Sequence, residues 1–183
     1  MLASRTWPVA ALTATLLAAG CDDKKHVSSC SPLANTSTAS QSGGHAGQTM
    51  SLTDVQAKGD RCVDRITFSF RRQGAAQPGY TVHYLPAAQA TLEDGSGRKL
   101  KIAGKAFLVV RIFPAATAIA SGDKLEFTYR GKRLQPAGMR HVKEIVKTGD
   151  FEAVVTWAIG LDGKRPFKLS GSSSAPGFTV EIG

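Results

Sequence analysis

The sequence predicts an all-β fold, an antiparallel β-sandwich, in residues 55–183. From Val63 onward, short segments alternate between apolar and polar residues, which is typical of strands with one buried face. Glycine-rich turns separate these segments, and about eight or nine short strands joined in this way indicate a sandwich. Helical spacing is suggested only at 115–120, where Pro114 and Gly122 would keep a helix short.

Each predicted strand follows from a local pattern. Segment 106–113 is almost continuously apolar, so we expect both of its faces to be covered. The longest alternation is 151–159, in which Phe151 and Trp157 share one face and Thr156 lies on the other. We therefore expect Trp157 in the core rather than stacked on a sugar. The predicted strands are 66–70, 80–84, 100–102, 106–113, 125–129, 142–146, 151–159, 167–169 and 178–182.

The N-terminus has the layout of a secretory signal. Arg5 precedes an apolar run at 7–19, which is too short to span a bilayer as a helix. Cys21 follows the segment LLAAG, which resembles a bacterial lipobox, although the usual leucine position is occupied by Ala18. The resemblance implies that Cys21 takes a diacylglyceryl group on its sulfur and becomes the mature N-terminus. The alternative is an ordinary signal peptide cleaved nearby, with Cys21 incidental.

Three regions follow from these patterns. Residues 1–20 are predicted to be a lipoprotein signal peptide. Residues 21–54 are predicted to be a flexible, low-complexity linker, because Ser, Thr, Gly and Ala dominate without apolar periodicity. Residues 55–183 are predicted to be one folded domain, a usual size for a domain with its own core.

If Cys21 carries lipid, Cys30 and Cys62 are the remaining cysteines. Exported proteins meet oxidising conditions, so these two either form a disulfide or stay free, and sequence alone does not give the Cα separation that decides. No cysteine pair has the spacing of metal ligands, and the histidines are isolated. We therefore expect no metal and no cofactor.

The net charge of +9 bears on partners. Outside the cytoplasm a basic protein meets anionic lipid, wall polymer or acidic glycan, and no nucleic-acid partner is expected because no groove-docking motif is present. Two basic groups are candidate sites for an anionic polymer. A solvated strand edge protected by lysines is the equally good alternative. The groups are Arg98, Lys99 and Lys101, and Arg130, Lys132 and Arg133.

Catalytic residues are not predicted. The segment 94–97 (Asp-Gly-Ser-Gly) lacks the strand–turn–helix context of a nucleophile elbow. Nothing in the spacing of Glu144, Asp150 and Glu152 indicates that these carboxylates converge in a cleft. Asp64 and Arg65 are neighbours on a strand and point to opposite faces, so we expect each to make its own structural contact.

Five ordered motifs resemble the AMIN-like domain of actinobacterial lipoproteins. The resemblance runs from about Gly59 to the C-terminus, and the family's members share the layout of lipobox, low-complexity linker and C-terminal domain. The chain departs from the family at 175–178, where Ala-Pro-Gly-Phe replaces the usual Pro-Pro-Arg turn. The motifs are DRITF at 64–68, PGYTVHY at 78–84, GRKLKIAG at 97–104, VKEIVKTGDFE at 142–152 and TWAIGL at 156–161.

The resemblance implies a β-sandwich related to the AMIN domain. That domain targets cell-wall amidases and secretion-pore proteins to the envelope and is associated with binding of peptidoglycan or related polymer. We therefore expect a non-enzymatic, lipid-anchored protein on the outer side of the cell membrane that binds wall polymer or glycan. An envelope protein-interaction module is the first alternative, and a divergent hydrolase is the second.

Overall fold

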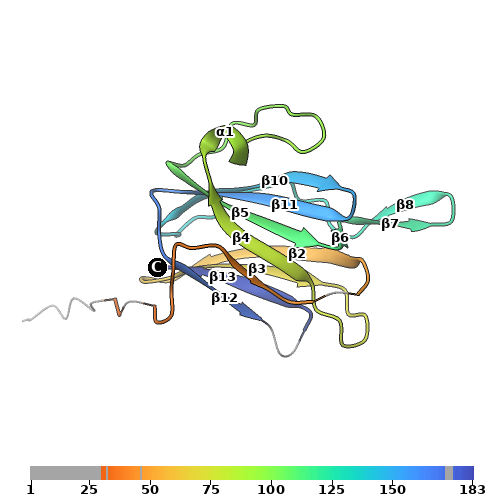
Figure 1. Cartoon of the computed structure of the whole chain (residues 1–183), viewed down its shortest axis with the longest axis horizontal. Helices are drawn as coiled ribbons and strands as arrows, with labels where there is room; N and C mark the ends of the chain where they lie inside the picture. Colours follow the sequence, from red (N-terminus) through yellow and green to blue (C-terminus); the bar gives the residue numbers. More distant parts are fainter. Residues whose placement is uncertain (1–29, 32, 46, 172–174) are drawn as a thin grey trace, which may run out of the picture.

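Two β-sheets stack face to face in the described part of the chain, which comprises residues 30–31, 33–45, 47–171 and 175–183 of this computed structural model (Figure 1). The six-stranded sheet has the order β1 (Gln41–Gly43), β4 (Gly79–Leu85), β5 (Ala106–Phe113), β11 (Val154–Leu161), β10 (Val142–Phe151) and β9 (Arg133–Leu134). The five-stranded sheet has the order β12 (Phe167–Gly171), β13 (Gly177–Ile182), β3 (Asp64–Phe70), β2 (Met50–Gly59) and β6 (Ala115–Ala116).

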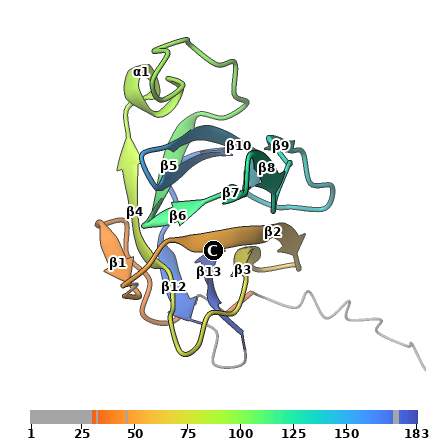
Figure 2. The same cartoon turned by 90° about the vertical axis from the view of Figure 1, so that its right-hand side faces the viewer.

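The predicted all-β sandwich is confirmed. Neighbouring strands in both sheets run antiparallel, apart from the short parallel pair of β2 and β6. A separate hairpin of β7 (Ala118–Ser121) and β8 (Lys124–Phe127) projects from one end, and the short helix α1 (Ala87–Ala90) lies at the outer side of the six-stranded sheet. Figure 2 shows α1 above the layer that contains β5 and β10, with β2, β3 and β13 in the layer below.

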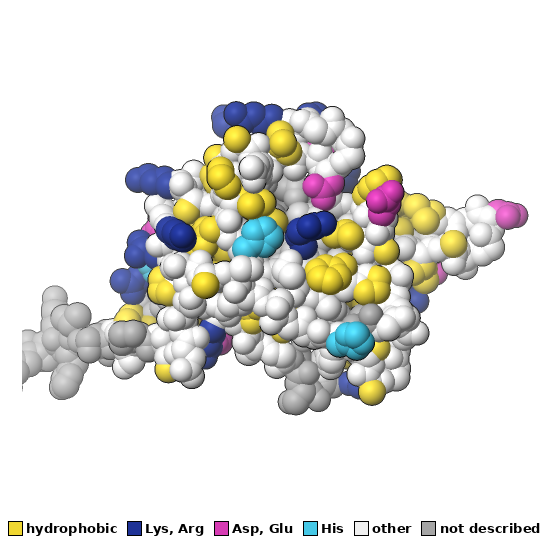
Figure 3. All heavy atoms as spheres, in the orientation of Figure 1, with side chains coloured by type: hydrophobic (Ala, Val, Ile, Leu, Met, Phe, Trp, Pro, Cys, Tyr) yellow, Lys and Arg dark blue, Asp and Glu magenta, His cyan; other side chains and the backbone are white. Residues whose placement is uncertain are grey.

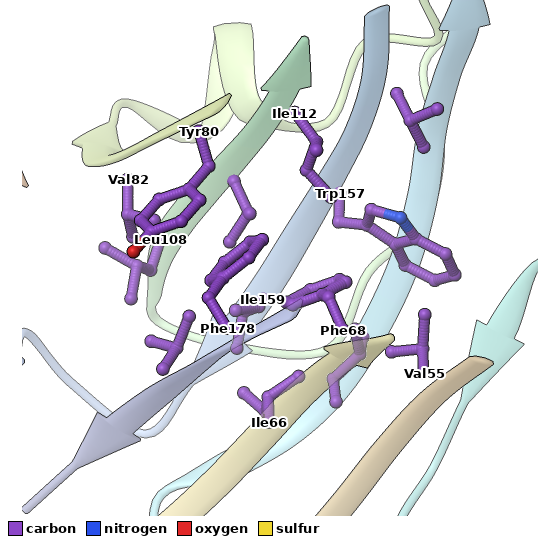
Figure 4. Packing of buried hydrophobic residues seen from close by; sticks show 14 of the residues in the cluster. Val55, Ile66, Phe68, Tyr80, Val82, Leu108, Ile112, Trp157, Ile159 and Phe178 are labelled. Atoms are coloured by element: carbon purple, nitrogen blue, oxygen red, sulfur yellow. The ribbon is translucent and has the colours of Figure 1, made fainter. Parts of the chain in front are cut away.

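Aromatic side chains fill the space between the sheets. Phe68 lies near Trp157 and Phe178, with ring centroids 6.0 and 5.0 Å away (Figure 4). Tyr80 stacks on Phe178 at 3.8 Å. Trp157 is fully buried, which confirms its predicted place in the core. Burial of each such ring stabilises the sandwich by about 2–3 kcal/mol before conformational entropy is counted.

A second hydrophobic cluster lies on the outer face of the six-stranded sheet. The segment 86–105, which contains α1, folds over this face as a cover and buries Ala90 and Ile102 against β5, β10 and β11. The backbones come closest at Gly160, where an added Cβ would lie 1.9 Å from the carbonyl oxygen of Ala103. Gly160 therefore lets the cover seat directly on β11.

The cover reaches only part of β5. Phe107 and Val109 are buried beneath it, as the apolar run predicts. Arg111 and Phe113 lie farther along the same outer face and are exposed, so the prediction that both faces of 106–113 are covered is wrong for this end of the strand. The outer face of the sheet stays open where the cover ends.

The predicted strand at 151–159 is confirmed from Val154 onward, where it is β11, but is wrong at 151–153, because the alternation continues through a turn. β10 ends at Phe151, and Glu152 and Ala153 form a two-residue turn with φ of 50° and 58°. Phe151 pairs directly with Val154, and directly paired residues share a face of the sheet. Phe151 consequently lies on the outer face, 61% exposed, while Trp157 points into the core.

Two further predicted elements differ from the structure. Segment 100–102 belongs to the cover and forms no strand of a sheet. Segment 115–120 is not a helix but forms β6 and part of β7, because the amide of Ala115 donates to the carbonyl of Ala153 and β6 pairs with β2. Pairing with distant strands overrides the weak local preference for helix.

The fold begins before Val55, which was the predicted first residue of the domain. β1 pairs with β4, Ser37 forms a bridge with Phe167, and β2 starts at the buried residue Met50. A disulfide joins Cys30 to Cys62 in the β2–β3 turn, with a Cα separation of 5.2 Å. The small polar residues of β1 show no apolar periodicity in the sequence. Their backbone groups nevertheless pair with the open edge of β4.

The predicted signal peptide at 1–20 and the lipidation site Cys21 lie outside the described residues. Within the described ranges, no helix has the length and apolar character needed to cross a membrane.

Candidate functional site

A groove of about 390 Å³ lies on the open part of the outer face of the six-stranded sheet. Its floor comes from three neighbouring strands, where the register places Arg111 of β5 between Thr81 of β4 and Thr156 of β11. Thr148 of β10 extends this row of outward-facing polar side chains. We call this feature the outer-face groove.

The outer-face groove has two unlike walls. On one side stand residues of the cover, including Leu92 and Asp94. On the other side the β10–β11 turn contributes Phe151 and Glu152. Figure 3 shows histidine, basic and acidic side chains among hydrophobic ones on the face below α1. An aromatic surface beside hydroxyl and charged groups is the usual composition of a site for a polar organic ligand.

The polar groups of the floor differ in how far a ligand can reach them. Arg111 forms no ion pair with a carboxylate among the described residues. The hydroxyl of Thr156 is buried and has no hydrogen-bond partner. Burial lowers the pKa of His83, and the positive charge of Arg111 lowers it further, so His83 is neutral at pH 7.

Two smaller hollows lie beside the outer-face groove. The groove shares Asp94 and Thr148 with a hollow of about 250 Å³, and that hollow shares Lys132 and Lys147 with another of about 200 Å³ beside Phe127. The chain crosses between neighbouring hollows, because the amide of Asp94 donates to the carbonyl of Thr148 at 2.8 Å and the amide of Lys147 donates to the carbonyl of Lys132 at 2.9 Å. The outer-face groove is therefore a site of its own, and the two hollows are separate depressions next to it.

The structure brings the two predicted basic groups together. The guanidinium of Arg133 donates to the carbonyl of Lys101 over 3.1 Å, which places the second group beside the first. Arg98 donates to both carboxylate oxygens of Glu93, at 2.9 and 3.1 Å. This contact lowers the pKa of Glu93 to about 2, and the charge of Lys132 contributes.

The arginines of the two groups are engaged within the protein. Arg98 pairs with Glu93, Arg133 pairs with Glu144, and Arg130 lies over the ring of Phe127 at 4.2 Å. The lysines remain without a carboxylate partner among the described residues. The exposed lysine edge therefore consists of Lys99, Lys101 and Lys132.

Glu144 has a structural role at the bottom of a depression of about 400 Å³ between the cover and β10. It is 2% exposed and accepts hydrogen bonds from the amide of Ala103 at 2.7 Å and from Gln135 at 2.8 Å, besides its pair with Arg133. Burial alone would raise the pKa of Glu144, but these donors outweigh it and hold the pKa below its usual value. Glu144 thus fastens the cover to β10.

The three carboxylates that could have formed a catalytic set have separate partners. Glu144 bonds to the cover and Arg133, Asp150 accepts hydrogen bonds from Thr117 and Lys147, and Glu152 lies in the β10–β11 turn. Among the residues with described positions, no group of three or more His, Cys, Asp or Glu side chains is placed to hold a metal ion.

Asp64 and Arg65 have the structural roles expected of them. The buried carboxylate of Asp64 accepts from the amides of Arg140, His141 and Val142 at 2.7–2.9 Å. Arg65 pairs on the opposite side of β3 with Asp60 and Glu181. β3 lies inside the sheet, between β13 and β2, rather than at its edge.

The turn before the last strand closes a corner of the sandwich. Gly177 occupies a place where the related family has arginine, and a Cβ there would lie 2.4 Å from the carbonyl oxygen of Phe68. Its amide donates to the side chain of Gln77 at 3.0 Å. This corner has no room for a longer side chain.

The sequence did not point to the residues of the outer-face groove as a site. One signal was present: Arg111 is the charged residue inside the apolar run 106–113, which indicates that one face of this strand is not fully covered. Phe151 and Thr156 carried no such signal, because their faces depend on the position of the turn between β10 and β11.

Fold and groove together define an antiparallel β-sandwich with a partly polar groove on the outer face of one sheet. The chain belongs to the AMIN-like domain family, whose model matches residues 50–182. The match starts at the first residue of β2 and confirms the family resemblance over nearly the whole fold. No curated protein and no solved structure matches the chain.

Proposed function

We propose that this protein is a non-enzymatic, lipid-anchored module of the cell envelope that binds wall glycan polymer along the outer-face groove. The observation that carries the proposal is Arg111 on the groove floor, without a carboxylate partner among the described residues, beside the exposed ring of Phe151. Family membership supports an envelope role, and the binding of a glycan is our extension of it.

The groove chemistry favours sugar units over a simple polyanion. The exposed ring of Phe151 offers an apolar surface for a sugar face, and the half-buried imidazole of His83 offers a hydrogen bond. Arg111 suits a ligand oxygen or carboxylate. Asp94 and Glu152 line the same groove and would repel a uniformly negative chain.

The exposed lysine edge supports the same function at longer range. Lys132 lines the hollow next to the outer-face groove, and Lys99 and Lys101 lie on the neighbouring cover. Charges at exposed positions attract an anionic polymer but contribute modestly, and salt screens them over about 10 Å at 0.1 M. The lysines therefore tune capture, while the groove gives the contact its chemistry.

Export and lipidation are supported by the N-terminal sequence. Arg5, the apolar run at 7–19 and the lipobox-like segment before Cys21 have the order of a lipoprotein signal. The Cys30–Cys62 disulfide suits an oxidising compartment. The proposed location is the outer side of the cell membrane.

A protein-interaction module is the second candidate, and one observation favours it. The projecting β7–β8 hairpin exposes Leu125 and Phe127 at 61% and 44%. Exposed apolar side chains on a projecting element are typical of contact surfaces between proteins. Leu125→Ala would weaken partner capture in that case and leave wall binding intact.

A pull-down with purified cell wall tests glycan binding. We expect the chain from Asp22 to Gly183 to be retained, and Phe151→Ala to weaken retention about three- to tenfold through the lost aromatic contact. Leu125→Ala is the matched control. Leu125 is exposed and apolar but lies outside the outer-face groove, so this variant should bind as the wild type does. No retention at low salt, or equal binding by the two variants, would overturn the proposal.

Metabolic labelling with a palmitate analogue tests the anchor. The full chain should carry label and sediment with membranes, and Cys21→Ser should lose both properties. Label that persists in Cys21→Ser would show that the lipid is attached at another residue. A full chain without label would show that the protein is not a lipoprotein.

A further inference from the structure

One end of the sandwich carries five exposed cations, four from segments that connect strands and one, Lys143, from the start of β10. The register places the ends of β2, β3, β5, β10, β11 and β13 at this end. Figure 1 shows the C-terminus there, and Figure 3 shows Lys and Arg side chains gathered at the same end. We call these residues the basic pole: Arg61, Lys105, Arg140, Lys143 and Lys164.

No member of the basic pole forms an ion pair with a carboxylate among the described residues. The acids at this end are already engaged. Gly183 also lies here, and a carboxylate on it would offset at most one of the five cations. The engaged acids are Asp60 and Glu181 with Arg65, Asp162 with Arg165 and His141, and Asp64 with backbone amides.

The N-terminal segment joins the fold at the basic pole. The disulfide fixes Cys30 to the β2–β3 turn, and the guanidinium of Arg140 lies 3.4 Å from the sulfur of Cys30. The same guanidinium donates to the carbonyl of Arg61 over 3.0 Å. The covalent attachment and the unpaired charge therefore occupy one end of the molecule.

We propose that the basic pole docks on an anionic lipid bilayer. A row of unpaired Lys and Arg side chains binds such a surface by about 1 kcal/mol for each cation near it, which is roughly fivefold in affinity. With no carboxylate partner to release, the five pole cations keep their full charge for the headgroups.

Chain length favours lipid over wall polymer as the partner of the pole. Residues 22–29 separate Cys21 from Cys30, and a chain of this length spans at most about 30 Å. This step rests on the lipid anchor proposed above, whereas the charge of the pole does not. An anchor at Cys21 would hold the pole within that distance of the headgroups.

Docking at the basic pole would orient the rest of the molecule. The β7–β8 hairpin lies at the opposite end of the sandwich (Figure 1). The outer-face groove lies on the side of the sandwich, on strands that run from the pole toward the hairpin. Both surfaces would then point away from the bilayer, toward the wall.

Vesicle flotation of the unlipidated chain from Asp22 to Gly183 tests the pole without the anchor. This chain keeps every described residue. We expect it to float with phosphatidylglycerol vesicles, to stay unbound with phosphatidylcholine vesicles, and to dissociate as salt rises.

Two triple variants with the same change in charge locate the contact. Lys105→Gln, Lys143→Gln and Lys164→Gln together should weaken flotation at least about tenfold. Lys99→Gln, Lys101→Gln and Lys132→Gln together remove three charges from the lysine edge and should weaken it less than about threefold.

Equal losses in the two triple variants would show that net charge alone governs binding and would overturn the proposal. Flotation that survives the pole variant would overturn it as well. Wall retention of the pole variant separates the two proposals, because the outer-face groove is unchanged in it. A pole variant that still binds wall but not vesicles supports both.

Discussion

Asp64 shows how one buried carboxylate can connect two sheets. It belongs to β3 of the five-stranded sheet, and its oxygens accept three consecutive amides that lead into β10 of the six-stranded sheet. The side chain of Asp64 thereby supplies a buried acceptor to each of these amides.

Replacement of Asp64 by Ala should therefore destabilise the fold strongly. Three buried donors would lose their acceptor, and we expect a decrease of about 3 kcal/mol in the free energy of unfolding. Urea denaturation followed by tryptophan fluorescence measures it. Asp123→Ala, at the exposed tip of the β7–β8 hairpin, should change stability by less than about 0.5 kcal/mol.

Thr156 separates binding from stability at a single residue. Its buried hydroxyl has no partner, so Thr156→Val removes an unpaired polar atom and keeps the side-chain shape. We expect stability to be unchanged or higher by up to about 1 kcal/mol, and wall retention to be unchanged because the hydroxyl has no exposed surface. A clear loss of stability would show that the hydroxyl has a structural partner instead.

At the scale of elements, the cover is fastened by one close approach and one buried carboxylate. Gly160→Ala would place a methyl group against the carbonyl of Ala103, and β11 lies too deep in the sheet to move aside. We expect the segment 86–105 to be displaced, with a loss of about 1–3 kcal/mol. Hydrogen exchange of the amides of Ala103 and Lys105 measures the displacement, and Gly163→Ala, which meets open space, is the control.

The disulfide holds the N-terminal segment onto the two sheets. It closes a loop with a sequence separation of 32, which corresponds to about 3–4 kcal/mol of stabilisation in the chain-entropy description. Cys62→Ser and Cys30→Ser should each lower the free energy of unfolding by a similar amount, and the double variant should not add to it. Additive losses would contradict the disulfide.

At the scale of the whole molecule, acid should destabilise the fold through a set of ion-paired carboxylates. Hydrogen bonds from neighbouring arginines lower the pKa of each to about 2, below the value near 4 in an unfolded chain. Their stabilisation is fully present above about pH 4 and is lost as the pH falls toward 2. The groups are Asp60, Glu93 and Asp162.

Thermal unfolding between pH 7 and pH 2 measures this dependence. We expect the Tm to change little through these groups down to about pH 4 and then to fall. Asp162→Asn, which cannot titrate, should have a lower Tm at pH 7 and a shallower fall in acid. A Tm that stays constant to pH 2 would show that these pairs do not contribute.

The predictability of the fold and of the site differ for a physical reason. Alternation identified most strands and placed Trp157 in the core, because burial imposes a period of two on any strand with one wet face. The same rule failed at Phe151. The two-residue turn at Glu152 and Ala153 does not interrupt the alternation in the sequence, but it places Phe151 on the opposite face of the sheet from Trp157. The groove depends on that reversal, so sequence reasoning favoured the basic groups instead.

The sequence by itself determined the all-β class, the family and the excess of positive charge, since each is a property of composition or of local order along the chain. Only the tertiary structure decided which charges are free. Arg98 and Arg133 are paired with Glu93 and Glu144, whereas Arg111 and the basic pole have no carboxylate partner in the described residues. Ion pairing depends on distances of a few ångströms between residues far apart in sequence, and folding alone sets those distances.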